Sequence, residues 1–115
     1  MLARLLGDID EATAPETFSL LRQSLGKTTL FGQARAYEAI FGMNYDTRLT
    51  EITTPTLVLA GAADPSTPPE RMQIYADGIA GARMVTLEKA GHFPNVETPK
   101  AFNAALIAFL DELPD

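Results

Sequence analysis

Two side chains of this protein are of the types that together move protons. Asp64 and His92 each lie in a loop that follows a predicted strand, over Thr56 to Ala60 and over Arg83 to Leu87. A carboxylate beside an imidazole fixes the imidazole's tautomer and stabilises its protonated form, so that the ring can take a proton from a nucleophile. The pair therefore predicts acid–base chemistry centred on His92, the single histidine of the chain.

Each of the two residues alone also has an ordinary interpretation. A lone histidine in a loop is often structural or simply exposed, and Gly91 and Pro94 beside it are common turn residues. Asp64 could equally bond the backbone amides of its own loop. The functional interpretation depends on position, because ligands and catalytic groups gather beyond the carboxyl ends of parallel strands, where both loops emerge.

The strands that carry these loops are short and aliphatic. Thr56 to Ala60 (TLVLA), led in by Pro55, is typical of a strand buried on both faces of a parallel sheet. Arg83 to Leu87 follows after a predicted helix, and the strand, helix and strand form a βαβ unit with a right-handed crossover. Neighbouring strands are about 4.8 Å apart, so Asp64 can reach His92.

Helices are predicted from apolar spacing and from end signals. Capping boxes mark two starts, Thr13 with Glu16 and Thr67 with Glu70, each with a proline in the first turn. The predicted helices cover Met1 to Gly7, Thr13 to Gly26, Thr28 or Thr29 to Gly42, Pro68 to about Ala80 with Gly81 as the stop, and Thr98 onward. The last has an apolar stripe that needs a sheet to pack on: Phe102, Ala105, Leu106, Phe109 and Leu113.

Phe31, Tyr37 and Phe41 lie at helical spacing in the third predicted helix. They predict a packed helix face that, in a cap, could instead line an acyl site.

Composition excludes several classes of function. The 115 residues are 46% hydrophobic and 21% charged, which suits one compact domain, and the net charge of −6 disfavours nucleic acid and anionic membranes as partners. The longest apolar run, Leu57 to Ala63, is too short to span a bilayer. Without cysteine there is no disulfide framework, so the cytoplasm is expected. Neither a metal nor a cofactor is expected, because no ligand cluster or phosphate loop is visible.

The residues around the pair resemble a known family. Pro55 to Gly61 (PTLVLAG), Asp64 with Thr67-Pro68-Pro69, and Ala90-Gly91-His92 with Glu97, Pro99 and Phe102 behind it are similar to the C-terminal portion of α/β-hydrolases, in particular 3-oxoadipate enol-lactonases and related esterases. Asp46 to Ile52 (DTRLTEI) resembles the segment that leads out of the cap. The resemblance covers about residues 29 to 113. It implies an α/β fold, a partial α/β-hydrolase: residues 1–45 would be the helical tail of a cap and residues 46–115 the last two parallel strands with their flanking helices.

The resemblance also implies roles and a substrate class. Asp64 would be the acid and His92 the base of a catalytic triad that cleaves a small carboxylic ester or lactone. The nucleophile elbow G-x-S-x-G has no counterpart here, since Ser19 and Ser24 lie in a predicted helix and Ser66 lacks that context. The serine is thus expected from sequence outside these residues. The pair could instead activate water, but no donor site for an oxyanion is visible.

The alternative is a non-catalytic hydrolase remnant that associates with itself or with a partner. A two-stranded sheet is marginal alone, and a bare strand edge tends to pair with another chain. We expect that edge to be covered by a missing N-terminal portion, by a second copy in a homodimer, or by residues 1–45 folded over it.

Overall fold

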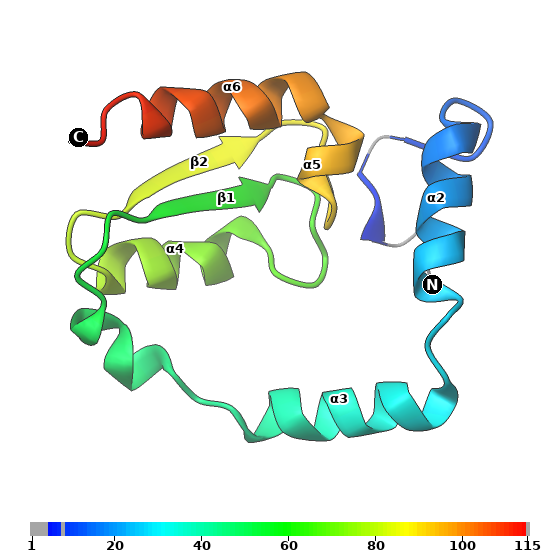
Figure 1. The fold of residues 1–115 in the computed structure, drawn as a ribbon, viewed down its shortest axis with the longest axis horizontal. Coiled ribbons are helices and arrows are strands. Elements are labelled where there is room, and N and C mark those ends of the chain that lie inside the picture. Colours follow the sequence, from blue (N-terminus) through cyan, green and yellow to red (C-terminus); the bar gives the residue numbers. More distant parts are fainter. Residues whose placement is uncertain (1–4, 8, 115) are drawn as a thin grey trace.

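The sheet consists of the two predicted strands, paired in parallel. The computed structural model describes residues 5–7 and 9–114. In it β1 (Leu57–Gly61) pairs with β2 (Arg83–Leu87), in a register that sets Leu57 opposite Arg83 and Gly61 opposite Leu87. β2 has its predicted bounds, whereas β1 lies one residue later than predicted. The carboxyl ends of both strands point the same way, as Figure 1 shows. The loops with Asp64 and His92 follow these two carboxyl ends.

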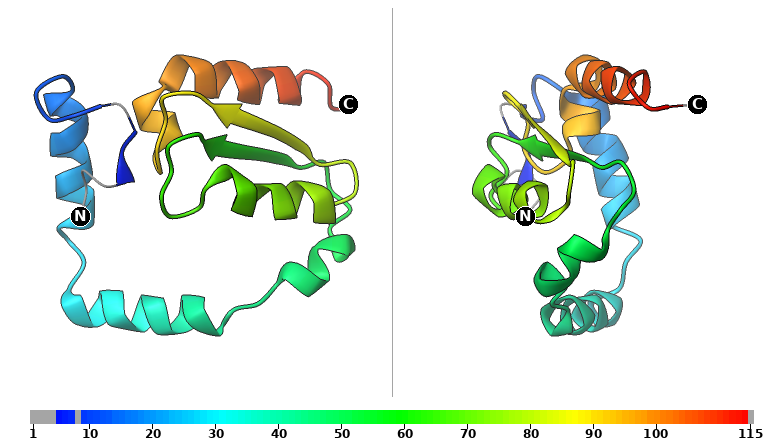
Figure 2. Two further views of the ribbon diagram at one scale, coloured as in Figure 1. Left: turned by 180° about the vertical axis from the view of Figure 1, so that it is seen from behind. Right: turned by 90° about the vertical axis from the view of Figure 1, so that its left-hand side faces the viewer.

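Helices cover both faces of this sheet. The crossover helix α4 (Pro69–Gly78) lies on one face and the C-terminal helix α6 (Pro99–Leu110) on the other (Figures 1 and 2). The predicted stripe of α6 is confirmed, because its residues are the partly buried ones while Ile107 and Leu110 are 56% and 51% exposed. Leu113 belongs to the stripe but lies beyond the end of the helix. A short helix inside the predicted loop, α5 (Pro94–Glu97), precedes α6.

The N-terminal helices differ in how much of their surface is buried against the rest of the protein. α2 (Pro15–Leu25) buries Phe18 and Leu21 against Leu6, and Ile9 and Phe93 pack onto this cluster. This contact ties α2 to the loop that carries His92. The helix predicted for Met1 to Gly7 lies largely outside the described residues.

α3 (Leu30–Gly42) stands apart from the sheet in both Figure 1 and Figure 2, and no residue of it is buried. Leu30, Phe31 and Phe41 are 85%, 76% and 84% exposed, and the rings of Tyr37 and Phe41 stack on each other at 6.1 Å. The prediction of a packed face is therefore wrong among the described residues, since nothing described covers these side chains. No helix in the described part of the chain is long and apolar enough to cross a membrane.

A 3₁₀ helix that the sequence analysis did not predict, η1 (Asp46–Glu51), connects α3 to the sheet and is fixed on α4. Arg71 donates to both carboxylate oxygens of Asp46, at 2.8 and 3.0 Å, and its guanidinium lies 5.2 Å from the ring centre of Tyr75. Leu49 is buried beside Gly78, where a Cβ atom would come within 2.6 Å of the leucine side chain. Glycine at position 78 therefore allows η1 to approach α4 closely.

Both predicted capping boxes are wrong, and in both cases the threonine bonds an aspartate three residues before it. The Thr13 hydroxyl donates to the Asp10 carboxylate at 2.8 Å, and that of Thr67 donates to the Asp64 carboxylate at 2.7 Å. Neither threonine hydroxyl accepts from an amide in the first turn of the helix that follows, which is the bond a capping box requires. The helices therefore begin later than predicted, at Pro15 and Pro69.

The predictions for the other helix ends are confirmed in part. Thr29 does cap α3, by accepting from the Gly32 amide at 3.0 Å. Pro68 is the N-cap of α4 rather than its first helical residue, and α4 ends at Gly78 rather than near Ala80. Gly81 lies in the turn that follows, with a φ of 75° that favours glycine.

One edge of β1 is unpaired among the described residues, as the sequence led us to expect. The sheet of residues 5–7 and 9–114 has only the order β1-β2, so the second edge of β1 has no strand beside it. The described part of residues 1–45 contributes helices and turns, and none of it pairs with this edge. Folding of that segment over the edge is therefore not seen.

A charge at a buried position of β1 should destabilise the sheet. Val58 is 6% exposed, so Val58→Lys is expected to lower the free energy of unfolding by about 3 kcal/mol or more, the cost of a buried charge without a partner. Thr86 lies on the paired strand but is exposed, so Thr86→Lys should change it by about 0.5 kcal/mol or less. Urea unfolding followed by circular dichroism measures both, and equal effects would contradict the assigned burial.

Candidate functional site

The loop after β1 is held in place by the strand and loop beside it. The Ala62 amide donates to the Leu87 carbonyl at 3.0 Å and the Ala63 amide to the Ala90 carbonyl at 2.9 Å. The Asp64 amide then donates to the Gly61 carbonyl at 3.2 Å, which closes a tight turn. Asp64 is thereby directed toward the loop that follows β2.

Asp64 is the one polar residue that the described core buries, at 7% exposure. One carboxylate oxygen accepts from the backbone amides of Ser66 and Thr67, at 2.8 and 3.2 Å. The other accepts from the Thr67 hydroxyl at 2.7 Å and contacts His92. Burial by itself would raise the pKa of this carboxyl group, but the hydrogen bonds from Thr67, His92 and Ser66 outweigh it and lower the pKa. Asp64 is therefore an anion at neutral pH.

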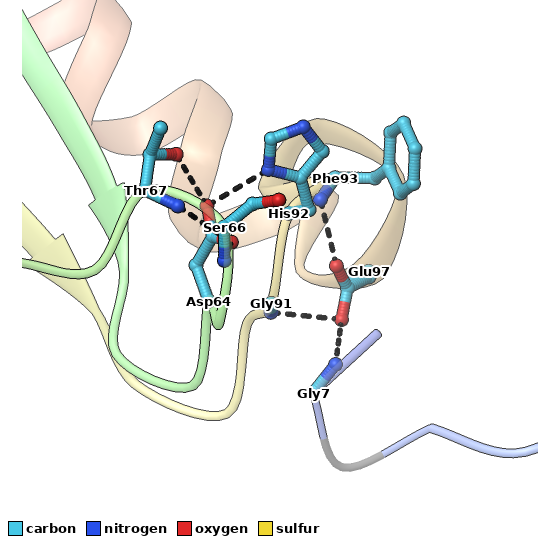
Figure 3. Close-up of polar contacts among 8 residues, drawn as sticks. All are labelled: Gly7, Asp64, Ser66, Thr67, Gly91, His92, Phe93 and Glu97. Carbon is cyan, nitrogen blue, oxygen red and sulfur yellow. Dashed lines mark hydrogen bonds and ion pairs between the residues drawn. The ribbon is translucent and has the colours of Figure 1, made fainter. Parts of the chain in front are cut away.

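The structure brings the two predicted site residues together. His92 Nδ1 lies 2.9 Å from Asp64 Oδ2. Because an ionised carboxylate can only accept hydrogen bonds, Nδ1 must donate, and in the neutral ring Nε2 is left as the acceptor. Figure 3 shows the second ring nitrogen on the side of the imidazole away from Asp64. With 36% of the side chain exposed, Nε2 can accept a proton from a group outside this pair.

The backbone of the His92 loop is enclosed on two sides. A Cβ atom at Gly61 would lie 2.1 Å from the Gly91 carbonyl oxygen, so only glycine lets the two loops approach this closely. On the other side the His92 amide donates to the Leu5 carbonyl at 2.5 Å. Phe93 meets the His92 ring edge-on, with ring centres 5.2 Å apart, and joins the α2 cluster. The imidazole is thus supported from several segments.

Sequence reasoning missed the part that Thr67 plays in this site. It assigned Thr67 to a helix cap, but both the hydroxyl and the amide of Thr67 bond Asp64. The sequence does contain a signal for this role. A threonine three residues after an aspartate in a loop is typical of a local turn in which the aspartate side chain accepts from the backbone amides that follow it.

No described serine completes the pair. The chain has three serines, of which Ser19 and Ser24 are exposed on α2 and Ser66 is exposed after Asp64. Ser66 bonds Asp64 through its backbone amide, and none of the three is hydrogen-bonded to His92 in residues 5–7 and 9–114. Nor do any three His, Cys, Asp or Glu side chains in that part of the chain form a group that could hold a metal ion.

Comparisons with known proteins show the family to which the chain belongs. An α/β-hydrolase family model described as TAP-like protein matches residues 36–113. The chain is 35% identical over 97 residues to 3-oxoadipate enol-lactonase 2 of Acinetobacter baylyi, a match that covers 84% of this chain and 36% of that protein. It is 32% identical over 111 residues to RutD of Pseudomonas savastanoi, described as a candidate carbamate hydrolase, across 95% of this chain and 38% of that one.

A solved structure is similar over almost the whole chain. The enol-lactonase from Burkholderia xenovorans LB400 superposes with a TM-score of 0.88 at 31% identity, covering 96% of this chain and 42% of that one. The predicted resemblance and the predicted fold class, a partial α/β-hydrolase, are therefore confirmed. The chain spans between about a third and two fifths of the length of these relatives.

The lowered pKa of Asp64 gives the stability of the fold a defined pH dependence. Since the folded-state pKa lies below the ordinary value of 3.8, the stabilisation is fully present above that pH and is lost as pH falls through the folded-state pKa. Asp64→Asn removes this ionisation, so its stability should fall less than that of the wild type between about pH 6 and about pH 3. Urea unfolding at each pH measures the difference. Asp111→Asn, at an exposed acid, should follow the wild type, and a parallel curve for Asp64→Asn would contradict the assignment.

Proposed function

We propose, from the premise that this chain belongs to the α/β-hydrolase family, that Asp64 and His92 are the acid and base of a serine-type hydrolase. The substrate would be a small carboxylic ester or lactone, and the serine nucleophile would come from residues outside these 115. The observation that carries the proposal is the 2.9 Å contact between Nδ1 of the ring and a buried carboxylate, with Nε2 left as the acceptor.

In the proposed reaction His92 moves the proton and Asp64 orients the ring. His92 Nε2 takes the proton of the serine hydroxyl as its oxygen attacks the carbonyl carbon, and the Asp64 carboxylate stabilises the imidazolium that forms. The imidazolium then gives the proton to the leaving alkoxide oxygen, and the acyl group stays on the serine. A water molecule, deprotonated by His92 in the same way, releases the acid.

The proposed substrate class rests on the relatives and on the exposed helix α3. Relatives that match over long stretches are named as an enol-lactonase or described as a candidate carbamate hydrolase. The lactone and carbamate bonds that these names imply each join a carbonyl carbon to a leaving heteroatom. Under the proposal residues 1–45 are the tail of a cap. The apolar side chains of α3, Leu30, Phe31 and Phe41, then face an acyl group or the rest of the core.

The 115-residue chain alone should have little activity. Asp64 and His92 supply proton transfer, but triad members act as a unit with donors aimed at the oxyanion. A serine and such donors must therefore be present before the pair contributes its full effect.

A chimera tests the roles directly. The part of the Acinetobacter baylyi enol-lactonase that precedes its matching region is joined to this chain, and hydrolysis of the lactone and of a small aryl ester is followed. We expect the chimera to hydrolyse at least one of them. His92→Ala should lower kcat by about a thousandfold or more, because the serine loses its base.

Lys100→Ala, an exposed position on α6, is the matched control and should leave the rate of the chimera unchanged. Full activity in the His92→Ala chimera would overturn the role proposed for His92. An unmodified chimera that folds, binds the substrate and yet fails to hydrolyse it would overturn the proposed reaction.

The unpaired edge of β1 favours a second candidate, a non-catalytic module that associates with itself. This candidate predicts a dimer of the 115-residue chain at micromolar concentration and no esterase activity in the chimera. Sedimentation equilibrium measures the mass. A monomer throughout that range would contradict the module, whereas the hydrolase proposal accommodates either mass and is decided by the chimera.

A further inference from the structure

A second acidic side chain organises the backbone around His92. Glu97 lies on α5, and its carboxylate accepts from the amides on both sides of the histidine: Gly91 at 2.9 Å through Oε2 and Phe93 at 2.9 Å through Oε1. Oε2 also accepts from the amide of Gly7, at 2.5 Å, from a segment 90 residues away in the sequence. Figure 3 shows these bonds spreading from the carboxylate to the N-terminal segment and to the His92 loop.

We infer that Glu97 is a positioning residue for His92. Among the described residues its carboxylate is hydrogen-bonded to backbone amides and not to Asp64 or the imidazole, so it acts through the main chain. By holding the residue before and the residue after His92, it fixes the direction in which the ring leaves the backbone. The inference deepens the proposed function, since it concerns how the same base is kept in place.

The chemistry of the three bonds favours a carboxylate over an amide. All three partners are N–H donors, and an ionised carboxylate offers acceptors at both of its oxygens. A glutamine of the same shape has one oxygen and one NH₂ group. It would set a donor against either the Phe93 amide or the amides of Gly7 and Gly91 and would leave at least one of them unsatisfied.

The two backbone segments that Glu97 bonds are also packed closely against each other. A Cβ atom at Gly91 would lie 2.3 Å from the Leu5 carbonyl oxygen, and one at Gly7 would lie 2.7 Å from the Lys89 carbonyl oxygen. Two segments can lie this close only when both have glycine at the contact. Glu97 therefore joins the N-terminal segment and the His92 loop into one unit, and the bond between the His92 amide and the Leu5 carbonyl, at 2.5 Å, completes it.

NMR spectroscopy of the complete 115-residue chain tests the inference without requiring activity. Because His92 is the single histidine, the carbon-bound Hδ2 and Hε1 signals of its ring are unambiguous. In Glu97→Ala, and more weakly in Glu97→Gln, we expect these signals to shift and broaden as the ring samples other positions. We also expect amide hydrogen exchange at Gly91 and Phe93 to accelerate by about tenfold or more, as loss of a charge-assisted hydrogen bond implies.

Glu88→Ala is the matched control, because Glu88 is an exposed acid at the start of the same loop. It should change neither the ring signals nor the two exchange rates. If Glu97→Ala does not fold, Glu97→Gln gives the same readout, with the change confined to one side of the histidine.

Unchanged ring signals in a folded Glu97 variant, whatever its melting temperature, would overturn the inference and leave Glu97 a purely structural residue. So would ring signals that change equally in Glu88→Ala. The test is separate from the proposed function. A chimera without hydrolysis would overturn the hydrolase proposal while the ring signals still decide the role of Glu97.

Discussion

The buried carboxylate of Asp64 remains an anion because hydrogen bonds replace the water that it loses. Two backbone amides, the Thr67 hydroxyl and His92 Nδ1 all donate to it. These bonds shape the loop after β1, delay the start of α4 and select the tautomer of the histidine. Without these bonds, burial alone would raise the pKa of the Asp64 carboxyl group.

The same principle applies on the far side of the histidine. Glu97 satisfies three backbone amides where the His92 loop meets the N-terminal segment. The two acids thus have complementary tasks, since Asp64 bonds the ring and Glu97 bonds the main chain that carries it. The backbone around His92 is therefore held by segments that are far apart in the sequence.

The sequence predicted the parts of the fold that depend on strong local patterns. The aliphatic run before Asp64, the Arg83 to Leu87 strand and the stripe on α6 were all correctly placed, and parallel pairing followed from the intervening helix. The errors arose where long-range or competing bonds decide. Thr13 and Thr67 bond a preceding aspartate and do not cap a helix. η1 is bonded by Arg71, which lies 25 residues beyond Asp46. The bonds of Glu97 to Gly7 and Gly91 could not be predicted, because backbone amides carry no sequence signal. The division at residues 45 and 46 remains a prediction.

Asp64 holds His92 as the tautomer with a proton on Nδ1 and a free Nε2. The most direct test is the pair of ¹⁵N chemical shifts of the imidazole in the unmodified chain, recorded above the pH at which the ring protonates. We expect a protonated Nδ1 and an unprotonated Nε2. A ring with its proton on Nε2, or one that exchanges evenly between the two tautomers, would contradict it.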